Sequence, residues 1–323
     1  MEEYRFSSYQ LDFIKAISLE TELFQYGPGF SYFSETDSYF DVVARSPWSN
    51  YGPDVVFFGH SWLSDSPAGP IESHRMRIES DVPVFFFLNK EYARLREKIE
   101  FIASYNPTAV FSHHHDISSL LGKEVTLPVH FVPFGVDPEK FGSRPKLHDI
   151  FFSGILRNPT YPDSQSDERI RIQSCLFRTI FGIRVKALTN WDIIWNSFTN
   201  SILVDWLNNY KRLDDTEYSE LLGATRIVFN ALSPGSLIGP RFFETMISKS
   251  VILTSRSANF AYFLREGKNC VFYDDPEDFI KQVGFLLEES DLLDRISINA
   301  RKDALKNHCW SHRVEEVLEL MLL

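Results

Sequence analysis

The sequence predicts an α/β protein made of two domains. Short apolar runs alternate with segments whose apolar residues recur at the helical period, which is typical of parallel sheets covered by helices. A run outside this pattern, residues 142–145 (Gly-Ser-Arg-Pro), is the best linker and divides the 323 residues into halves of roughly 145 and 175. Two such domains would enclose a cleft lined by the carboxyl ends of both sheets, where ligands of open α/β folds bind.

The first half contains four apolar runs of strand length, at residues 54–59, 82–88, 109–112 and 129–132. Between them, a charged amphipathic segment at 89–102 and a shorter segment at 117–121 predict helices. The sequence opens on a helical pattern within residues 4–20, where many α/β domains have a strand and a glycine-rich loop. We therefore expect the first domain to be trimmed or reorganised.

The second half repeats the alternation with five apolar runs. Strands are expected at 149–153, 184–188, 226–230, 251–254 and 271–273, and helices at 166–181, 216–222, 240–248, 276–288, 291–306 and 311–323. A tryptophan-rich stretch at 189–210 fits this alternation poorly. We expect it to form an insertion or a partly helical flap.

The composition limits the classes of binding partner and the cellular compartment that we expect for this chain. The net charge of −11 disfavours broad binding to nucleic acid or to anionic membranes, although a local basic cleft stays open. The three cysteines, Cys175, Cys270 and Cys309, are widely separated and show neither metal-site nor disulfide spacing, which fits a reducing compartment. The first residues do not resemble a signal peptide, and no apolar run approaches the length of a membrane span. We expect a cytoplasmic protein.

The segment at 235–255 carries the strongest functional signal. Gly239 ends a loop, and Pro240 is suited to the first position of a helix, whose N-terminus would offer N–H groups to a phosphate. Arg241 and Glu244 lie three residues apart on one helix face, so they could add a positive charge and a carboxylate that accepts two ribose hydroxyls. The alternative is an ordinary amphipathic helix with a surface Arg–Glu pair.

Four segments in order resemble the glycosyltransferase-B superfamily. HFVPFGVDPEKF (130–141) is similar to the end of that superfamily's first domain, and DIFFSGILRN (149–158) to the first strand and loop of its second domain. The Arg241/Glu244 segment resembles its nucleotide-binding helix. NHCWSHR (307–313) is similar to the ending of family-one-type, spore-protein-like glycosyltransferases.

This resemblance implies two Rossmann-like domains facing a central cleft, with a C-terminal helix that crosses back to the first domain. It implies an acceptor-side domain at 1–145, a nucleotide-sugar-binding domain at 146–308 and the returning helix at 309–323. The implied activity is transfer of a hexose-type sugar from a nucleoside-diphosphate donor to an acceptor hydroxyl on a glycan, protein or small molecule. No metal and no cofactor are expected. The resemblance alone favours a retaining outcome, and Ser236 counts against it, because many retaining members have a second glutamate at that position.

The donor-binding candidates come from the residue patterns and from the resemblance together. These are Gly154, Arg157, Asn230, Gly239, Pro240, Arg241, Phe243 and Glu244. Arg241 is the first candidate to neutralise the charge of the departing diphosphate, and Arg157 is the second. The alternative for Arg157 is an ordinary solvated arginine in a loop. Asn230 at a strand end could bind a phosphate or a sugar hydroxyl, and an asparagine in a turn is equally expected there.

Histidines supply the acceptor-side candidates. His60 ends an apolar run and, with Arg241, is the catalytic candidate, either as proton acceptor or as a polar sugar contact; the alternative is a hydrogen-bonded histidine at a strand end. The run 113–116 (His-His-His-Asp) disfavours a metal site, because adjacent residues of an extended chain point to opposite faces. His115 and Asp116 are instead expected on the acceptor side.

Two other functions remain open. A sugar-nucleotide epimerase would share this architecture but would need several carboxylates in the cleft, and the sequence offers few. A non-catalytic sugar- or nucleotide-binding structural protein would explain both Ser236 and the altered start of the first domain. Donor turnover separates an enzyme from a binder, which a nucleotide would only stabilise.

Overall fold

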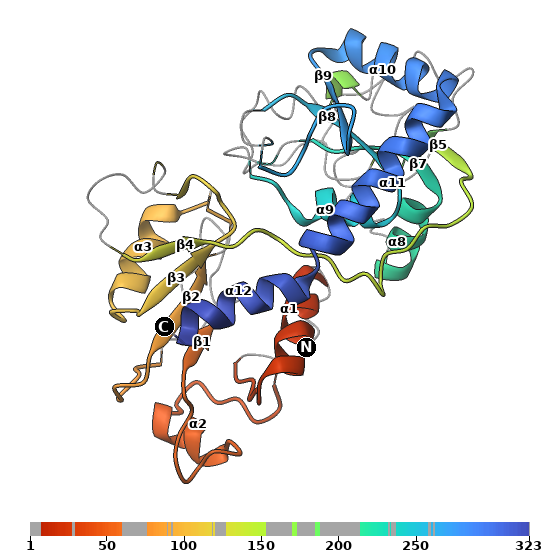
Figure 1. Cartoon of the computed structure of the whole chain (residues 1–323). Coiled ribbons are helices and arrows are strands. Elements are labelled where there is room, and N and C mark those ends of the chain that lie inside the picture. The colour runs from red at the N-terminus through yellow and green to blue at the C-terminus, as the bar shows by residue number, and fades with distance from the viewer. Residues whose placement is uncertain are drawn as a thin grey trace, which may run out of the picture. The chain divides into compact units, whose positions relative to one another are not determined.

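The chain divides into two compact units. In the computed structural model, the described residues are 8–27, 30–59, 76–88, 90–91, 93–117, 119, 127–152, 170–172, 185–187, 214–231, 233, 237–257, 260 and 262–322. Unit 1 comprises Met1–Phe134 and Trp310–Leu323, and unit 2 comprises Gly135–Cys309. Each unit is built on one parallel sheet, which confirms the α/β class (Figure 1).

The sheet of unit 1 has four parallel strands in the order β1-β2-β3-β4. These strands are β1 (Val56–Phe58), β2 (Val84–Leu88), β3 (Ala109–Ser112) and β4 (Val129–Phe131). All four coincide with predicted apolar runs. β2 is apolar at every position and every residue in it is buried, because helices cover both faces of a parallel sheet. Helix α3 (Leu95–Ala103) covers the face that carries Phe86 and Val110.

The opposite face of that sheet is covered by the first and last helices, α1 (Ser8–Glu20) and α12 (Trp310–Leu322). Phe13 of α1 contacts Trp310 of α12 and Phe87 of β2, with ring centroids 5.5 and 5.7 Å apart. Figure 1 shows the red α1 and the dark-blue α12 side by side. Arg313 of α12 is buried and donates a hydrogen bond from Nε to the Phe134 carbonyl (3.3 Å). The last helix is therefore part of the first unit.

Two helices of unit 1 differ from the prediction. Helix α2 (Tyr39–Arg45) was not expected, because seven residues are too few for a helical period to show; the signal for it is the capping box formed by Ser38 and Asp41. Helix α3 begins at Leu95 and not at residue 89. Lys90 and Arg94 adopt positive φ angles of 49° and 52°, which a right-handed helix does not allow.

The sheet of unit 2 has five parallel strands in the order β6-β5-β7-β8-β9. They are β5 (His148–Phe152), β6 (Val185–Ala187), β7 (Thr225–Phe229), β8 (Val251–Ser255) and β9 (Cys270–Tyr273). The helices described in this unit include α8 (Asp215–Gly223), α9 (Pro240–Ile247), α10 (Pro276–Glu288) and α11 (Ser290–Asn307). Alternate strand residues such as Phe229 and Leu253 form one core with Phe279 of α10 and Ile296 of α11.

The four-residue run predicted as a linker lies inside unit 2, against the end of α8. The Arg144 N–H donates to the Gly223 carbonyl at 3.1 Å. The Lys146 ammonium then donates to the carbonyls of Gly223, Thr225 and Ser248, at 2.9, 2.8 and 3.3 Å. The Lys146 side chain therefore joins carbonyl groups at the C-terminal ends of α8 and α9 to the first carbonyl of β7.

Some of the predicted segments lie mostly or wholly outside the described residues. This applies to most of the helix expected at 166–181, to the tryptophan-rich stretch at 189–210, and, in unit 1, to most of the short helix at 117–121. Among the helices that are described, none is both long enough and apolar enough to cross a bilayer.

Candidate functional site

The start of α9 has the geometry predicted for an anion-binding helix N-terminus. Gly239 is the N-cap in an extended conformation (φ −76°, ψ 170°) and, lacking a side chain, makes no capping hydrogen bond. Pro240 occupies the first helical position, where its missing N–H removes no helical bond. No side chain caps the backbone N–H groups of this first turn. They are therefore available to donate hydrogen bonds to a ligand at the helix N-terminus.

Glu244 and Arg241 lie one turn into α9, beside Tyr218 of α8. The Tyr218 hydroxyl donates a hydrogen bond of 2.8 Å to Oε2 of Glu244. Burial raises the pKa of Tyr218 well above its usual value, the negative charge of Glu244 adds to this increase, and the positive charge of Arg241 opposes it. Glu244 is 7% exposed. The structure therefore places a buried carboxylate and a guanidinium group beside the same tyrosine hydroxyl, unlike an exposed Arg–Glu surface pair.

Polar side chains follow the strands that end beside α9. Asn230 comes directly after β7, while Thr254 and Ser255 end β8, and these strands are neighbours in the sheet. Within the described part of the chain, Oδ1 of Asn230 and the hydroxyls of Thr254 and Ser255 are buried and have no hydrogen-bond partner. Buried polar atoms are normally hydrogen-bonded, so these three mark the carboxyl edge of the sheet as a place for a polar ligand or ordered water.

Asn230 also fixes α9 against the sheet. Its N–H donates to the Leu253 carbonyl (3.0 Å), and Nδ2 donates to Oγ1 of Thr245 (3.2 Å). Thr254 and Ser255 were not singled out from the sequence, although two hydroxyl residues directly after an apolar strand were a usable signal. The side chain of Phe243 lies in the interior of unit 2, against Phe263 and His308, with centroid distances of 5.6 and 4.9 Å. It supports α9 from beneath.

In unit 1, the histidine run directly follows β3. The His113 ring lies between Phe87 and Phe134 and its Nδ1 is 2.8 Å from the Val132 carbonyl, so this histidine is part of the core. Nδ1 of His114 accepts from the N–H of Asp116 (3.2 Å). His115 is half-buried and stacks on His114, whereas Asp116 is exposed and accepts from the Ser119 hydroxyl (2.7 Å). Both acceptor-side candidates therefore reach at least part of the surface.

A buried carboxylate beside this run was missed by sequence reasoning. Oε1 of Glu91 accepts from the Ser112 hydroxyl (2.7 Å) and from the His113 N–H (3.0 Å). Burial raises the pKa of Glu91, while these hydrogen bonds and the nearby His114 partly oppose the increase. Glu91 lies on a turn after β2 and carries no periodic signal, so only the three-dimensional structure places it at the ends of β2 and β3.

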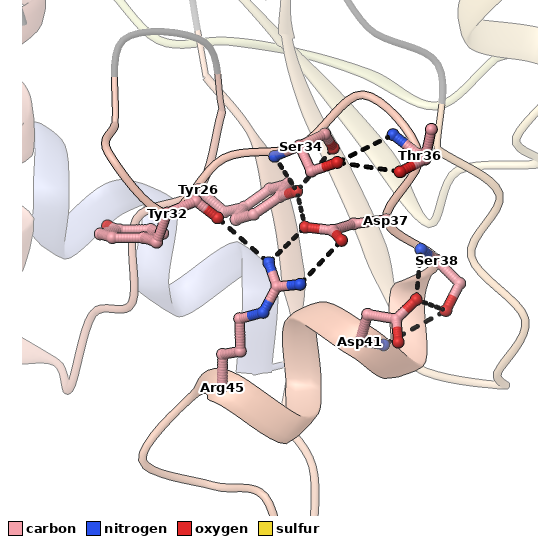
Figure 2. A network of polar contacts seen from close by, with 8 residues as sticks. All are labelled: Tyr26, Tyr32, Ser34, Thr36, Asp37, Ser38, Asp41 and Arg45. Carbon is pink, nitrogen blue, oxygen red and sulfur yellow. Dashed lines mark hydrogen bonds and ion pairs between the residues drawn. The ribbon is translucent and has the colours of Figure 1, made fainter.

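Unit 1 also contains a polar network around Asp37 (Figure 2). The carboxylate of Asp37 accepts from the Tyr26 hydroxyl and pairs with the guanidinium of Arg45, which also donates to the Tyr32 carbonyl (3.1 Å). These contacts attach the loop before α2 to the helix. Behind the loop lies an apolar cavity of ≈ 240 Å³, bounded by α1, α2, β1 and the end of α12.

Three predicted site residues, His60, Gly154 and Arg157, lie outside the described residues, as does Ser236. Within the described residues, the structure gathers no group of three His, Cys, Asp or Glu side chains that could hold a metal ion. The positions that it does bring together in unit 2 are Asn230, Gly239, Pro240, Arg241 and Glu244, with Phe243 beneath them.

Known glycosyltransferases resemble this chain, in sequence over part of its length and in fold over about three quarters of it. Residues 175–319 match a protein-family model described as glycosyl transferase-like. Sucrose-phosphate synthase from Thermosynechococcus elongatus is similar in structure, with 11% identity over 75% of this chain and 68% of its own, and a TM-score of 0.51. HepE from Anabaena, solved with UDP and glucose, has 10% identity over 74% of this chain and 71% of its own (TM-score 0.54).

TarM from S. aureus has 13% identity over 75% of this chain and a TM-score of 0.54, although the chain spans only 51% of its length. No curated protein sequence matches the chain. The chain therefore has the fold of these solved glycosyltransferases, and its residues 175–319 match the glycosyl transferase-like family model. Most of the residues that match the family model belong to unit 2, which carries the helix with Arg241 and Glu244.

Proposed function

We propose that the protein transfers a sugar from a nucleoside-diphosphate donor to an acceptor hydroxyl and that unit 2 binds the donor. The observation that carries this proposal is the start of α9. There, a side-chain-free N-cap, an arginine and a fixed carboxylate follow one another within six residues. Each suits one part of a nucleotide sugar: N–H groups and guanidinium suit the diphosphate, and the carboxylate suits the ribose hydroxyls.

In the proposed reaction, the bond between the anomeric carbon and the diphosphate oxygen breaks, and a bond from that carbon to the acceptor oxygen forms. The departing diphosphate gains negative charge. Arg241 and the N-terminal dipole of α9 would stabilise that charge, which is why no metal is required in this proposal. The acceptor hydroxyl loses its proton to a base, for which His60 is the candidate in unit 1, with His115 and Asp116 as contacts to the acceptor.

Glu244 has a binding role in this scheme. The Tyr218 hydroxyl donates a hydrogen bond to one oxygen of the Glu244 carboxylate. The carboxylate is therefore already oriented before the nucleotide binds. Because HepE was solved with UDP and glucose, uridine nucleotides are the first donors to test. The acceptor is proposed only as a hydroxyl compound, whether glycan, protein or small molecule.

The test combines a thermal-shift panel of nucleoside diphosphates with donor-hydrolysis assays. We expect one diphosphate to raise the melting temperature, because a ligand that binds only the folded state stabilises it. Arg241→Ala and Glu244→Ala should each weaken its binding by about tenfold or more, since each removes a charge-assisted contact. Arg295→Ala, which changes an exposed arginine of α11, is the matched control and should bind like the parent.

Parent-like affinity in both site variants would refute the donor site. Saturable nucleotide binding without turnover of any donor sugar would instead indicate a non-catalytic binder with this fold. Turnover that persists in the presence of a chelator would support metal independence, and its loss would refute that part of the proposal.

A further inference from the structure

Unit 2 contains a second polar groove, which is separate from the residues of the proposed donor site. It has a volume of ≈ 580 Å³. One wall is the turn before β9, with Tyr262, Arg265 and Lys268; the other is the last part of α11, with Lys302 and Lys306. The spacing of residues 299, 302, 303 and 306 places them on one face of that helix, so the wall is continuous.

The charges of this groove are mostly positive. Arg265, Lys268, Lys302 and Lys306 line it and are exposed, and none of the four forms an ion pair with any residue that the structure describes. The one carboxylate in the groove, Asp303, accepts hydrogen bonds from the side-chain amides of Asn269 (2.9 Å) and Asn307 (2.8 Å). Asp303 is therefore occupied by neutral amides and neutralises none of these cations directly.

Four neighbouring cations are unusual in a chain with a net charge of −11. Bringing like charges together on two facing walls costs free energy, and an anion between the walls would reverse that cost. The groove also holds the side chain of Tyr262, which is 68% exposed, together with amides from Asn299 and Asn307. An exposed aromatic ring offers an apolar face, and amides offer both donors and acceptors, as a sugar ring with hydroxyl groups requires.

We propose that this groove binds a saccharide chain that carries anionic groups. The cations would hold its phosphate or carboxylate groups, and Tyr262 and the amides would contact the sugar rings. A concave site with cations on facing walls suits a narrow chain better than the flat surface of a membrane, and the acidic chain as a whole disfavours long nucleic acids. The inference rests on the proposed function in one respect: the bound chain would be a remote part of the acceptor.

The experiment measures binding directly, without a donor, so its failure would leave the proposed sugar transfer intact. The probes are a short oligogalacturonate, a phosphorylated maltooligosaccharide and an unmodified maltooligosaccharide of the same length. Isothermal titration calorimetry is performed on the full chain at low and at physiological ionic strength. We expect at least one of the anionic probes to bind more tightly than the neutral one, and its affinity to fall as salt increases.

Paired variants locate the site. Lys302→Ala/Lys306→Ala should weaken the binding of the anionic probe by about tenfold, and alanine is well tolerated at exposed helix positions. Lys281→Ala/Arg295→Ala removes the same charge from exposed positions of α10 and α11 outside the groove and should bind like the parent. Tyr262→Ala should weaken binding, whereas Tyr262→Phe should retain most of it.

The proposal is overturned if both double variants lose affinity equally, because the effect would then be one of net charge alone. Equal affinity for the anionic and neutral probes also overturns it. Binding of phosphatidylserine vesicles or of a short single-stranded DNA that depends on Lys302 and Lys306, without binding of either anionic saccharide, would assign the groove to another class of partner.

Discussion

Glu91 shows how a single residue can link the folding of unit 1 to pH. Its carboxylate is 2% exposed and holds the turn after β2 against the end of β3 through Ser112 and His113. Because burial raises its pKa above the usual 4.5, the folded protein retains a proton that the unfolded chain has already released. The stability due to this proton is present at acidic pH and is lost as pH rises through the folded-state pKa.

We therefore predict that Glu91→Gln reduces the loss of stability as pH rises above 4.5, the usual pKa of a glutamate. Glutamine keeps an oxygen that can accept from Ser112 and His113, and it carries no charge to bury. Denaturant unfolding of parent and variant across this pH range measures the effect. Glu100→Gln, which changes an exposed partner of Arg96, is the control and should follow the parent. Parallel pH profiles for Glu91→Gln and the parent would contradict the prediction.

The residues of the candidate site were only partly accessible from the sequence. Arg241 and Glu244 could be found because their spacing places them on one helix face directly after a glycine and a proline. Tyr218 and Glu91 could not, since each reaches its partners from a different element: Tyr218 lies 26 residues from Glu244, and Glu91 lies 21 from Ser112. No periodicity within one segment reports such contacts.

Among the elements, the strands were the best predicted. Apolar runs that are buried on both faces have few other interpretations in an α/β chain, so β2 and β8 were located within one or two residues. Helix starts were less accurate, because they depend on local backbone geometry, as at Arg94, or on a capping box, as at Ser38. The order of the strands across each sheet was not predicted.

The end of α8 provides a test of packing between elements. A Cβ atom at Gly223 would lie 2.3 Å from the Gly142 carbonyl oxygen, so only glycine allows the chain after Phe141 to pass so closely. We predict that Gly223→Ala lowers the free energy of unfolding by about 2 kcal/mol, as expected for overpacking against a rigid backbone. Chemical denaturation measures this change.

Gly284→Ala is the matched control for that substitution. Gly284 lies within α10, and a Cβ atom added there would meet no other atom within 4 Å. Alanine should therefore stabilise this helix by up to about 1 kcal/mol. An equal response of the two glycine variants would show that the contact between Gly142 and Gly223 does not limit the side chain at position 223.

For the molecule as a whole, the donor proposal predicts which segments a bound nucleotide protects from hydrogen exchange. A diphosphate bound at α9 should slow hydrogen exchange in residues 225–231 and 237–257, which contain β7, α9 and β8. Exchange in β2 and α3 of unit 1 should change little. Hydrogen–deuterium exchange with and without UDP, read by mass spectrometry, makes this comparison. Protection confined to unit 1 would contradict the assignment of the donor to unit 2.

At this scale the two-domain α/β fold was predicted from the alternation of strands and helices, and the order of four short segments added the resemblance to known glycosyltransferases. The segments at 130–141 and 307–313 lie where the chain enters and leaves unit 2. Within unit 2, the Val136 N–H donates to the His308 carbonyl (3.0 Å), and Val136 forms a β-bridge with Cys309. The two segments, far apart in sequence, therefore meet at one local contact.

The membership of α12 in unit 1 also bears on how the protein is made. About 175 residues of unit 2 are translated between Phe134 and Trp310, which takes roughly 9–35 s at typical rates of synthesis. During that interval Phe13 lacks its contact with Trp310, so the part of unit 1 made first waits on the ribosome with an aromatic surface that α12 has not yet covered. A chaperone that binds exposed aromatic residues would find its substrate there until translation releases α12.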